Sequence, residues 1–131
     1  MKSLLILTSI FFSLAVGAEE APATVYIISP ADGEQIEGPV LVRFGLKGLG
    51  VAPAGVEHSG TGHHHLLINM DTLPALDQPL GKNVRHFGGG QTEALLDLPP
   101  GRHSLQLIMG DHLHIPLKPL LVSEKIYIEV K

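Results

Sequence analysis

Apolar and polar residues alternate in several short segments of the chain, which is the pattern of half-buried β-strands. Residues 40–48, VLVRFGLKG, place an apolar residue at every second position from Val40 to Leu46. Residues 102–109, RHSLQLIM, repeat the pattern, with Leu105 and Leu107 on one face. Further strands are expected at residues 25–29, 63–70, 91–98 and 123–130.

Proline and glycine separate these segments, as in Pro30-Ala31-Asp32-Gly33 and Pro99-Pro100-Gly101, where they favour tight turns. No window of more than a few residues has the periodicity of a helix. The pattern predicts an all-β protein, a single immunoglobulin/fibronectin-like antiparallel β-sandwich with long histidine- and glycine-rich loops. The order of the strands stays open.

The first eighteen residues have the features of a secretory signal peptide. Lys2 is basic, residues 4–16 form an apolar run, and small residues end at Ala18, where we expect cleavage. The run is shorter than the stretch of about 20 residues that a membrane helix needs, and we expect no membrane span after cleavage. The expected organisation is a signal peptide at 1–18, a linker at 19–24 and one β-sandwich domain at 25–131. This predicts a periplasmic or secreted bacterial protein.

The balance of charge makes some partners unfavourable. The chain has 9 Lys+Arg and 13 Asp+Glu, a formal net charge of −4, and loss of Lys2 with the signal peptide gives 8 − 13 = −5. Nucleic acid and anionic membranes are therefore not expected as partners, because both attract basic patches. The chain has no cysteine, which excludes disulfides, so an ordinary hydrophobic core has to hold the fold.

The eight histidines are the most informative residues of the chain. Most of them fall in three segments: GTGHHHLLIN at 60–69, RHFGGGQTE at 85–93 and GDHLHIP at 110–116. We expect these segments to meet in space. On a strand, His63 and His65 share one face and His64 lies on the other, so the three cannot all reach one centre. Either His63 and His65 act together, or His64 acts from the side that faces the core.

Two histidines separated by one residue place their imidazoles on the same side of a strand, about 6.5 to 7 Å apart at the backbone, where they can chelate one ion. The predicted metal ligands are His63, His65, His86, His112 and His114. Additional candidates are His64 and Asp111. Imidazole suits several transition metals, and we predict copper or zinc.

Three functions fit this pattern. The first is an exported protein that binds a transition metal. The second is a non-catalytic binding module of the cell envelope, with an envelope protein as partner, whose histidines are structural and hydrogen-bond to loop carbonyls. The third is an enzyme, which would have to be metal-dependent, since Ser104 and Ser123 lie in no nucleophile elbow and no cysteine is present. No residue is predicted to be catalytic, and an enzyme is the less favoured interpretation.

Several strings closely resemble a family of small exported bacterial domains. They are ISPADGEQIEGPVLVRFGLKGLGVAPAGVE, GTGHHHLLIN, LPALDQPL, RHFGGGQTE and LPPGRHSLQLIMGDHLHIP. The resemblance, to the family named DUF4399, a domain of unknown function, runs from about Tyr26 to Val130. It implies a compact β-domain outside the cytoplasm, and it supplies no activity or residue role that can be transferred.

Overall fold

The computed structural model describes residues 21–131, and all structural statements below concern these residues. The predicted signal peptide and the first two residues of the predicted linker lie outside them. Among the described residues the structure has strands and no helix, and it therefore contains no helix long and apolar enough to cross a membrane. The strands are β1 (Thr24–Ser29), β2 (Gln35–Ile36), β3 (Val40–Lys47), β4 (Gly50–Val51), β5 (Thr61–Ile68), β6 (Arg85–His86), β7 (Glu93–Leu96), β8 (Gly101–Gly110) and β9 (Ile126–Val130).

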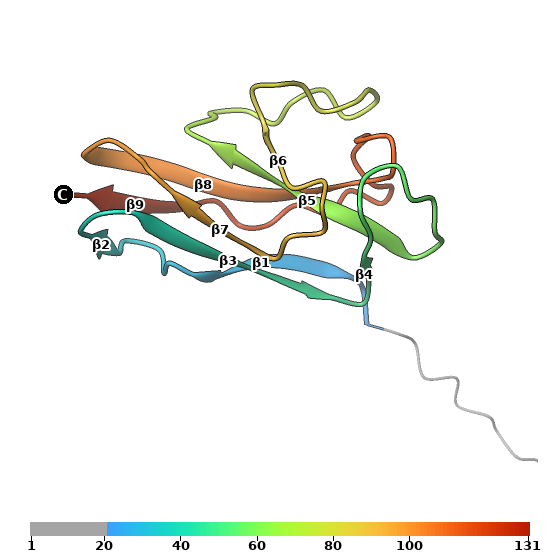
Figure 1. The fold of residues 1–131 in the computed structure, drawn as a ribbon, viewed down its shortest axis with the longest axis horizontal. Coiled ribbons are helices and arrows are strands. Elements are labelled where there is room, and N and C mark those ends of the chain that lie inside the picture. Colours follow the sequence, from blue (N-terminus) through green and yellow to red (C-terminus); the bar gives the residue numbers. More distant parts are fainter. Residues whose placement is uncertain (1–20) are drawn as a thin grey trace, which may run out of the picture.

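The strands form two sheets, which are stacked in Figure 1. The smaller sheet has the order β1-β3-β7 and is antiparallel. The larger sheet has the order β2-β9-β8-β5-β4, and the short β6 also pairs with β5. The predicted all-β sandwich is confirmed. The longer strands pair antiparallel as predicted, and only the two-residue strands β2 and β4 add parallel pairings among the described residues, with β9 and β5.

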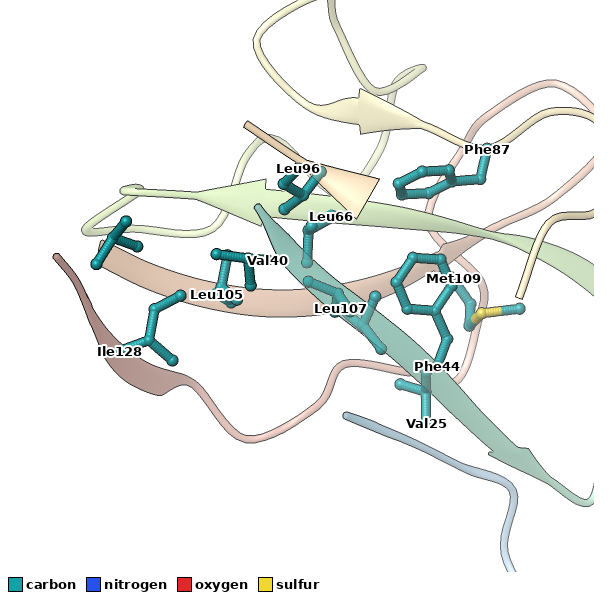
Figure 2. Close-up of a cluster of buried hydrophobic side chains, with 12 residues drawn as sticks. Val25, Val40, Phe44, Leu66, Phe87, Leu96, Leu105, Leu107, Met109 and Ile128 are labelled. Atoms are coloured by element: carbon teal, nitrogen blue, oxygen red, sulfur yellow. The ribbon is translucent and has the colours of Figure 1, made fainter. Parts of the chain in front are cut away.

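The main core lies between the two sheets and explains the alternation in the sequence. Val40, Val42 and Phe44 of β3 point inward, and Leu105 and Leu107 of β8 meet them. Figure 2 shows the core between the strands, with Val40 and Phe44 of β3, Leu105 and Leu107 of β8, Leu66 of β5, and Phe87, which follows β6. Burial of one such side chain stabilises the fold by about 1.5 to 3 kcal/mol.

The larger sheet is also covered on its outer face, and this second layer buries the site described below. Leu67 of β5 and Ile108 of β8 point away from the main core and pack with Val84. Val84 belongs to the long connection between β5 and β6, which runs over this face (Figure 1). β5 is therefore buried on both sides, and an outward histidine on it is not exposed to solvent.

Candidate metal centre

Strand β5 divides its three consecutive histidines between its two faces. His64 points toward the main core, where its ring lies 5.1 Å from the ring of Phe44. His63 and His65 point to the opposite face, and their rings lie 4.7 Å apart. All three side chains are at most 1% exposed. Of the two arrangements that the sequence allowed, the structure has the one in which His63 and His65 lie together.

His86 reaches this face through the pairing of β6 with β5. The register sets His86 opposite His65, and the centres of their rings are 5.1 Å apart. The next residue, Phe87, turns into the core and packs on Phe44, with 4.8 Å between the ring centres. Gly88 then lets the chain pass under the imidazole, since a Cβ at this position would lie only 2.3 Å from Cε1 of His86.

His114 comes from the loop that follows β8. Asp111 holds this loop, because its Oδ1 accepts hydrogen bonds from the backbone N–H groups of Leu113 (2.8 Å) and Ile115 (2.9 Å). His114 itself has a left-handed backbone with φ of 67°, which is uncommon for a residue other than glycine and costs roughly 1 kcal/mol or more. The fold holds this conformation, and it turns the imidazole toward β5.

The four side chains converge on one point. His63, His65, His86 and His114 each offer a ring nitrogen, and these four atoms all lie within 4.8 Å of one another. Nε2 of His63 is 3.0 Å from Nδ1 of His114 and 3.1 Å from Nε2 of His86. We call this group the four-histidine centre. A set of imidazole nitrogens at such distances can hold a metal ion.

Burial favours the neutral form of three of these histidines, His63, His65 and His86, by lowering their pKa values. It lowers the pKa of His63 from 6.5 to about 4 and that of His65 to about 3, with the neighbouring histidines adding to the effect. Burial, and then His114, also lower the pKa of His86. Neutral imidazole is the form that binds metals. Protons therefore compete little for these nitrogens at neutral pH.

The same shifts make the stability of the fold depend on pH. Burial also lowers the pKa of His64, to about 4, although the nearby backbone of Gln91 acts in the opposite direction. Above pH 6.5 the three histidines of β5 are mostly neutral in both the folded and the unfolded chain, so they do not lower the free energy of unfolding. As the pH falls from 6.5 through 4 toward 3, the unfolded chain binds protons that the buried side chains of His63, His64 and His65 do not yet bind. The free energy of unfolding therefore decreases over this range.

The histidine segments lie within the part of the chain that matches a known family. The sequence profile of the domain of unknown function DUF4399 matches residues 42–131, which is more than half of the chain. The chain belongs to the DUF4399 family. No curated protein matches it.

The fold of this DUF4399 domain also occurs in a solved structure. It is similar to the X-ray structure of the endo-beta-1,4-mannanase from Thermotoga petrophila, with a TM-score of 0.51 and 20% sequence identity. The similarity covers 88% of this chain and 21% of the mannanase chain, so the DUF4399 chain spans about a fifth of that protein. At this identity the likeness concerns the fold alone.

The structure places the other candidate ligands of the DUF4399 chain outside the four-histidine centre. Nε2 of His112 lies 4.0 Å from Oε2 of Glu57, and His112 is not among the residues whose nitrogens converge. His112 and His114 do not share one face of a strand, because β8 ends at Gly110 and the left-handed His114 turns the chain. His64 faces the core, and Oδ1 of Asp111 is engaged by the two loop amides.

The two remaining histidines have structural contacts. His103 lies between Asn69, whose Nδ2 is 2.9 Å from its Nδ1, and the carbonyl oxygen of Pro99, 2.7 Å from its Nε2. His58 is exposed, with Nδ1 2.8 Å from the carbonyl oxygen of Ser59. Both histidines therefore contact a carbonyl oxygen outside the four-histidine centre.

Two glycines approach the histidines of the centre closely. A Cβ on Gly110 would lie 2.7 Å from Cε1 of His65, and Gly88 has the corresponding relation to His86. For Gly88 the sequence carries a signal, because three glycines in a row follow Arg85-His86-Phe87 and favour a tight turn or a close approach of the backbone to the site. For Gly110 the only signal is a glycine at the end of a predicted strand.

Proposed function

We propose that the protein is an exported periplasmic protein that binds one transition-metal ion, copper or zinc, through the four-histidine centre. The observation that carries the proposal is the convergence of four ring nitrogens from three separate segments within 4.8 Å. Two of the four side chains, His63 and His65, are fully buried. Packing alone does not require the polar ring nitrogens of four histidines to converge on one point.

Unsatisfied polar atoms support a ligand at this point. Both ring nitrogens of His65 are buried without a hydrogen-bond partner, and each such group costs about 1 to 3 kcal/mol. A metal ion at the centre would satisfy one of them, because each histidine offers one ligand atom. Around a tetrahedral ion with bonds of about 2.0 Å, ligand nitrogens lie about 3.3 Å apart. The distances of 3.0 and 3.1 Å around His63 are near this value.

The donor set supports copper or zinc. It has four neutral nitrogens and no thiolate, which suits copper, zinc and other borderline metals over calcium or magnesium. Copper is favoured over zinc because it is highest in the affinity order for nitrogen ligands. The signal-like N-terminus supports export, and mass spectrometry of the protein from a periplasmic extract should find a mature chain that begins at Glu19.

Calorimetric titration of the mature protein with copper(II), and separately with zinc(II), tests the proposal. The test variant is His86→Ala/His114→Ala, which removes the two less buried members of the centre. The matched control is His58→Ala/His112→Ala, which removes two histidines outside it. We expect tight one-to-one binding in the wild type and the control and none in the test variant. Weak binding with several ions per chain, equal in all three proteins, would reject the proposal.

A second function is favoured by a specific observation. The contacts of His63 with His86 and His114, and the bridge of His103 between Asn69 and Pro99, link loops to strands. Histidines that act this way would serve a non-catalytic binding module of the cell envelope. In that case the metal-free His86→Ala/His114→Ala variant melts well below the metal-free wild type. If the variant binds no metal but melts at the same temperature as the metal-free wild type, His86 and His114 are metal ligands and do not stabilise the loops.

A further inference from the structure

An open pocket lies against the four-histidine centre. It has a volume of about 410 Å³. Its wall includes three of the four histidines, His65, His86 and His114. His63 is fully buried, whereas His86 is exposed and His114 half-buried. This pocket is therefore one side from which a molecule in solvent can reach the centre.

The same pocket is lined by two cations and no carboxylate. Lys82 and Arg85 contribute to its wall, and the remaining lining residues are apolar or glycine. Neither cation forms an ion pair with a carboxylate of residues 21–131. Arginine and lysine without a carboxylate partner are ready to bind an anion, and the planar guanidinium can pair with two oxygens at once.

A second pocket, on the side of His63, has the opposite character. Its volume is about 300 Å³, and Glu57, Asp111 and His112 are among its lining residues. Acidic groups favour a free metal cation here, whereas Lys82 and Arg85 repel one. The basic pocket is thus poorly suited to a bare cation and well suited to an anion.

The charge of a loaded centre leads to the same conclusion. Four neutral imidazoles contribute no negative charge, so a bound divalent ion keeps its charge of +2, next to Lys82 and Arg85. An anion that binds between the ion and these side chains would neutralise part of this charge. An oxygen-donor anion suits both borderline metals and guanidinium or ammonium groups.

Resting on the proposed metal-binding function, we propose that the loaded four-histidine centre takes an oxyanion, a carboxylate or a phosphate, as a further ligand from the basic pocket. One oxygen faces the metal, and the others accept hydrogen bonds from Lys82 and Arg85. The protein then binds its metal together with a small organic acid or phosphate.

The test uses the Lys82→Gln/Arg85→Gln variant of the full mature protein. Lys118→Gln/Lys131→Gln is the matched control, because it removes the same charge at two exposed sites that do not line the pocket. Copper(II) affinity is first measured in a buffer without coordinating anions. The copper(II)-loaded proteins are then titrated with acetate and, separately, with inorganic phosphate, and the visible absorption and electron paramagnetic resonance spectra of the ion are followed.

We expect either anion, or both, to shift the spectra of the wild type and the control with the same dissociation constant. In the Lys82→Gln/Arg85→Gln variant this constant rises at least about tenfold, as expected for the loss of charge-assisted hydrogen bonds. Its copper affinity without anion is unchanged or higher, since two repelling charges are gone. A shift with acetate alone identifies a carboxylate ligand, and a shift with phosphate alone identifies a phosphate.

Two results overturn the inference while the proposed function stands. One is a one-to-one copper complex whose spectra respond to neither anion. The other is anion binding that is equally strong in the wild type and the Lys82→Gln/Arg85→Gln variant. If the wild type binds no copper or zinc, the proposed function fails, and this inference fails with it.

Discussion

The change of Gly88 to alanine tests whether His86 is a metal ligand without touching any histidine. The added Cβ would lie 2.3 Å from Cε1 and 2.7 Å from Nε2 of the His86 ring. Ordinary contacts begin near 3.4 Å, so the ring has to move by about 1.1 Å, from 2.3 to 3.4 Å. The backbone of Gly88 does not have a positive φ, so alanine brings no backbone strain, and outside the His86 ring its nearest contact is the Cβ of Ala54 at 3.2 Å.

The expected loss follows from how little a metal bond can stretch. Distances between ligand and metal hold within about 0.2 Å, so a ring displaced by about 1.1 Å no longer binds in its original place. Changes that misplace a ligand lower metal affinity by about 10- to 100-fold, which is about 1.4 to 2.7 kcal/mol. His86 is exposed, so its ring can swing into solvent, and the metal-free protein should lose less than about 1 kcal/mol of stability.

Competition titration with a chromophoric chelator measures the affinity, and urea unfolding of the metal-free protein measures the stability. Gly89→Ala is the matched control, since its Cβ would meet only the flexible side chain of Gln91, at 3.0 to 3.2 Å. We expect the control to bind metal like the wild type. Equal metal affinity of Gly88→Ala, Gly89→Ala and wild type would refute the placement of His86 in the centre.

Three more substitutions separate the parts of the site. Gly110→Ala places a Cβ 2.7 Å from Cε1 of the buried His65. Because this ring cannot move into solvent, both the metal affinity and the stability of the metal-free protein should fall. Urea unfolding with and without zinc measures both effects. Asp111→Ala removes the acceptor of the two loop amides on either side of His114. The imidazole of His114 is then less well positioned, and the metal affinity should fall by about tenfold. Asp111→Asn keeps an acceptor oxygen and should retain most of the metal affinity in the same titration. His64→Leu removes a buried histidine with a lowered pKa. The free energy of unfolding of the metal-free variant should therefore decrease between pH 6.5 and 5 by roughly 1.5 kcal/mol less than that of the wild type. Urea midpoints measured over this pH range that change equally in both proteins would contradict this.

The sequence predicted the strands whose two faces differ clearly. β3 and β8 alternate between large apolar and other residues, so their inward faces could be assigned, and the separation of His64 from His63 and His65 followed from the same period of two. The ends were less accurate. The strand expected at 91–98 is β7 at Glu93–Leu96, and the one expected at 123–130 is β9 at Ile126–Val130.

Features that depend on distant contacts could not be predicted. β4 and β6 have two residues each and exist only because β5 pairs with them, so neither has a period of its own. No pattern in the sequence separates His112 from His114, because the choice depends on the left-handed backbone at His114. The meeting of the three histidine segments, by contrast, was expected from the grouping of the histidines along the chain and is present in the structure.

X-ray absorption spectroscopy of the zinc-loaded mature protein tests the central claim most directly. The account predicts three or four imidazole nitrogens at about 2.0 Å from one zinc ion, with the multiple-scattering pattern of histidine rings. It also predicts that His86→Ala/His114→Ala abolishes this signal and that His58→Ala/His112→Ala preserves it. A zinc ion surrounded mainly by oxygen, or a spectrum that is the same in both variants, would contradict the four-histidine centre as the metal site.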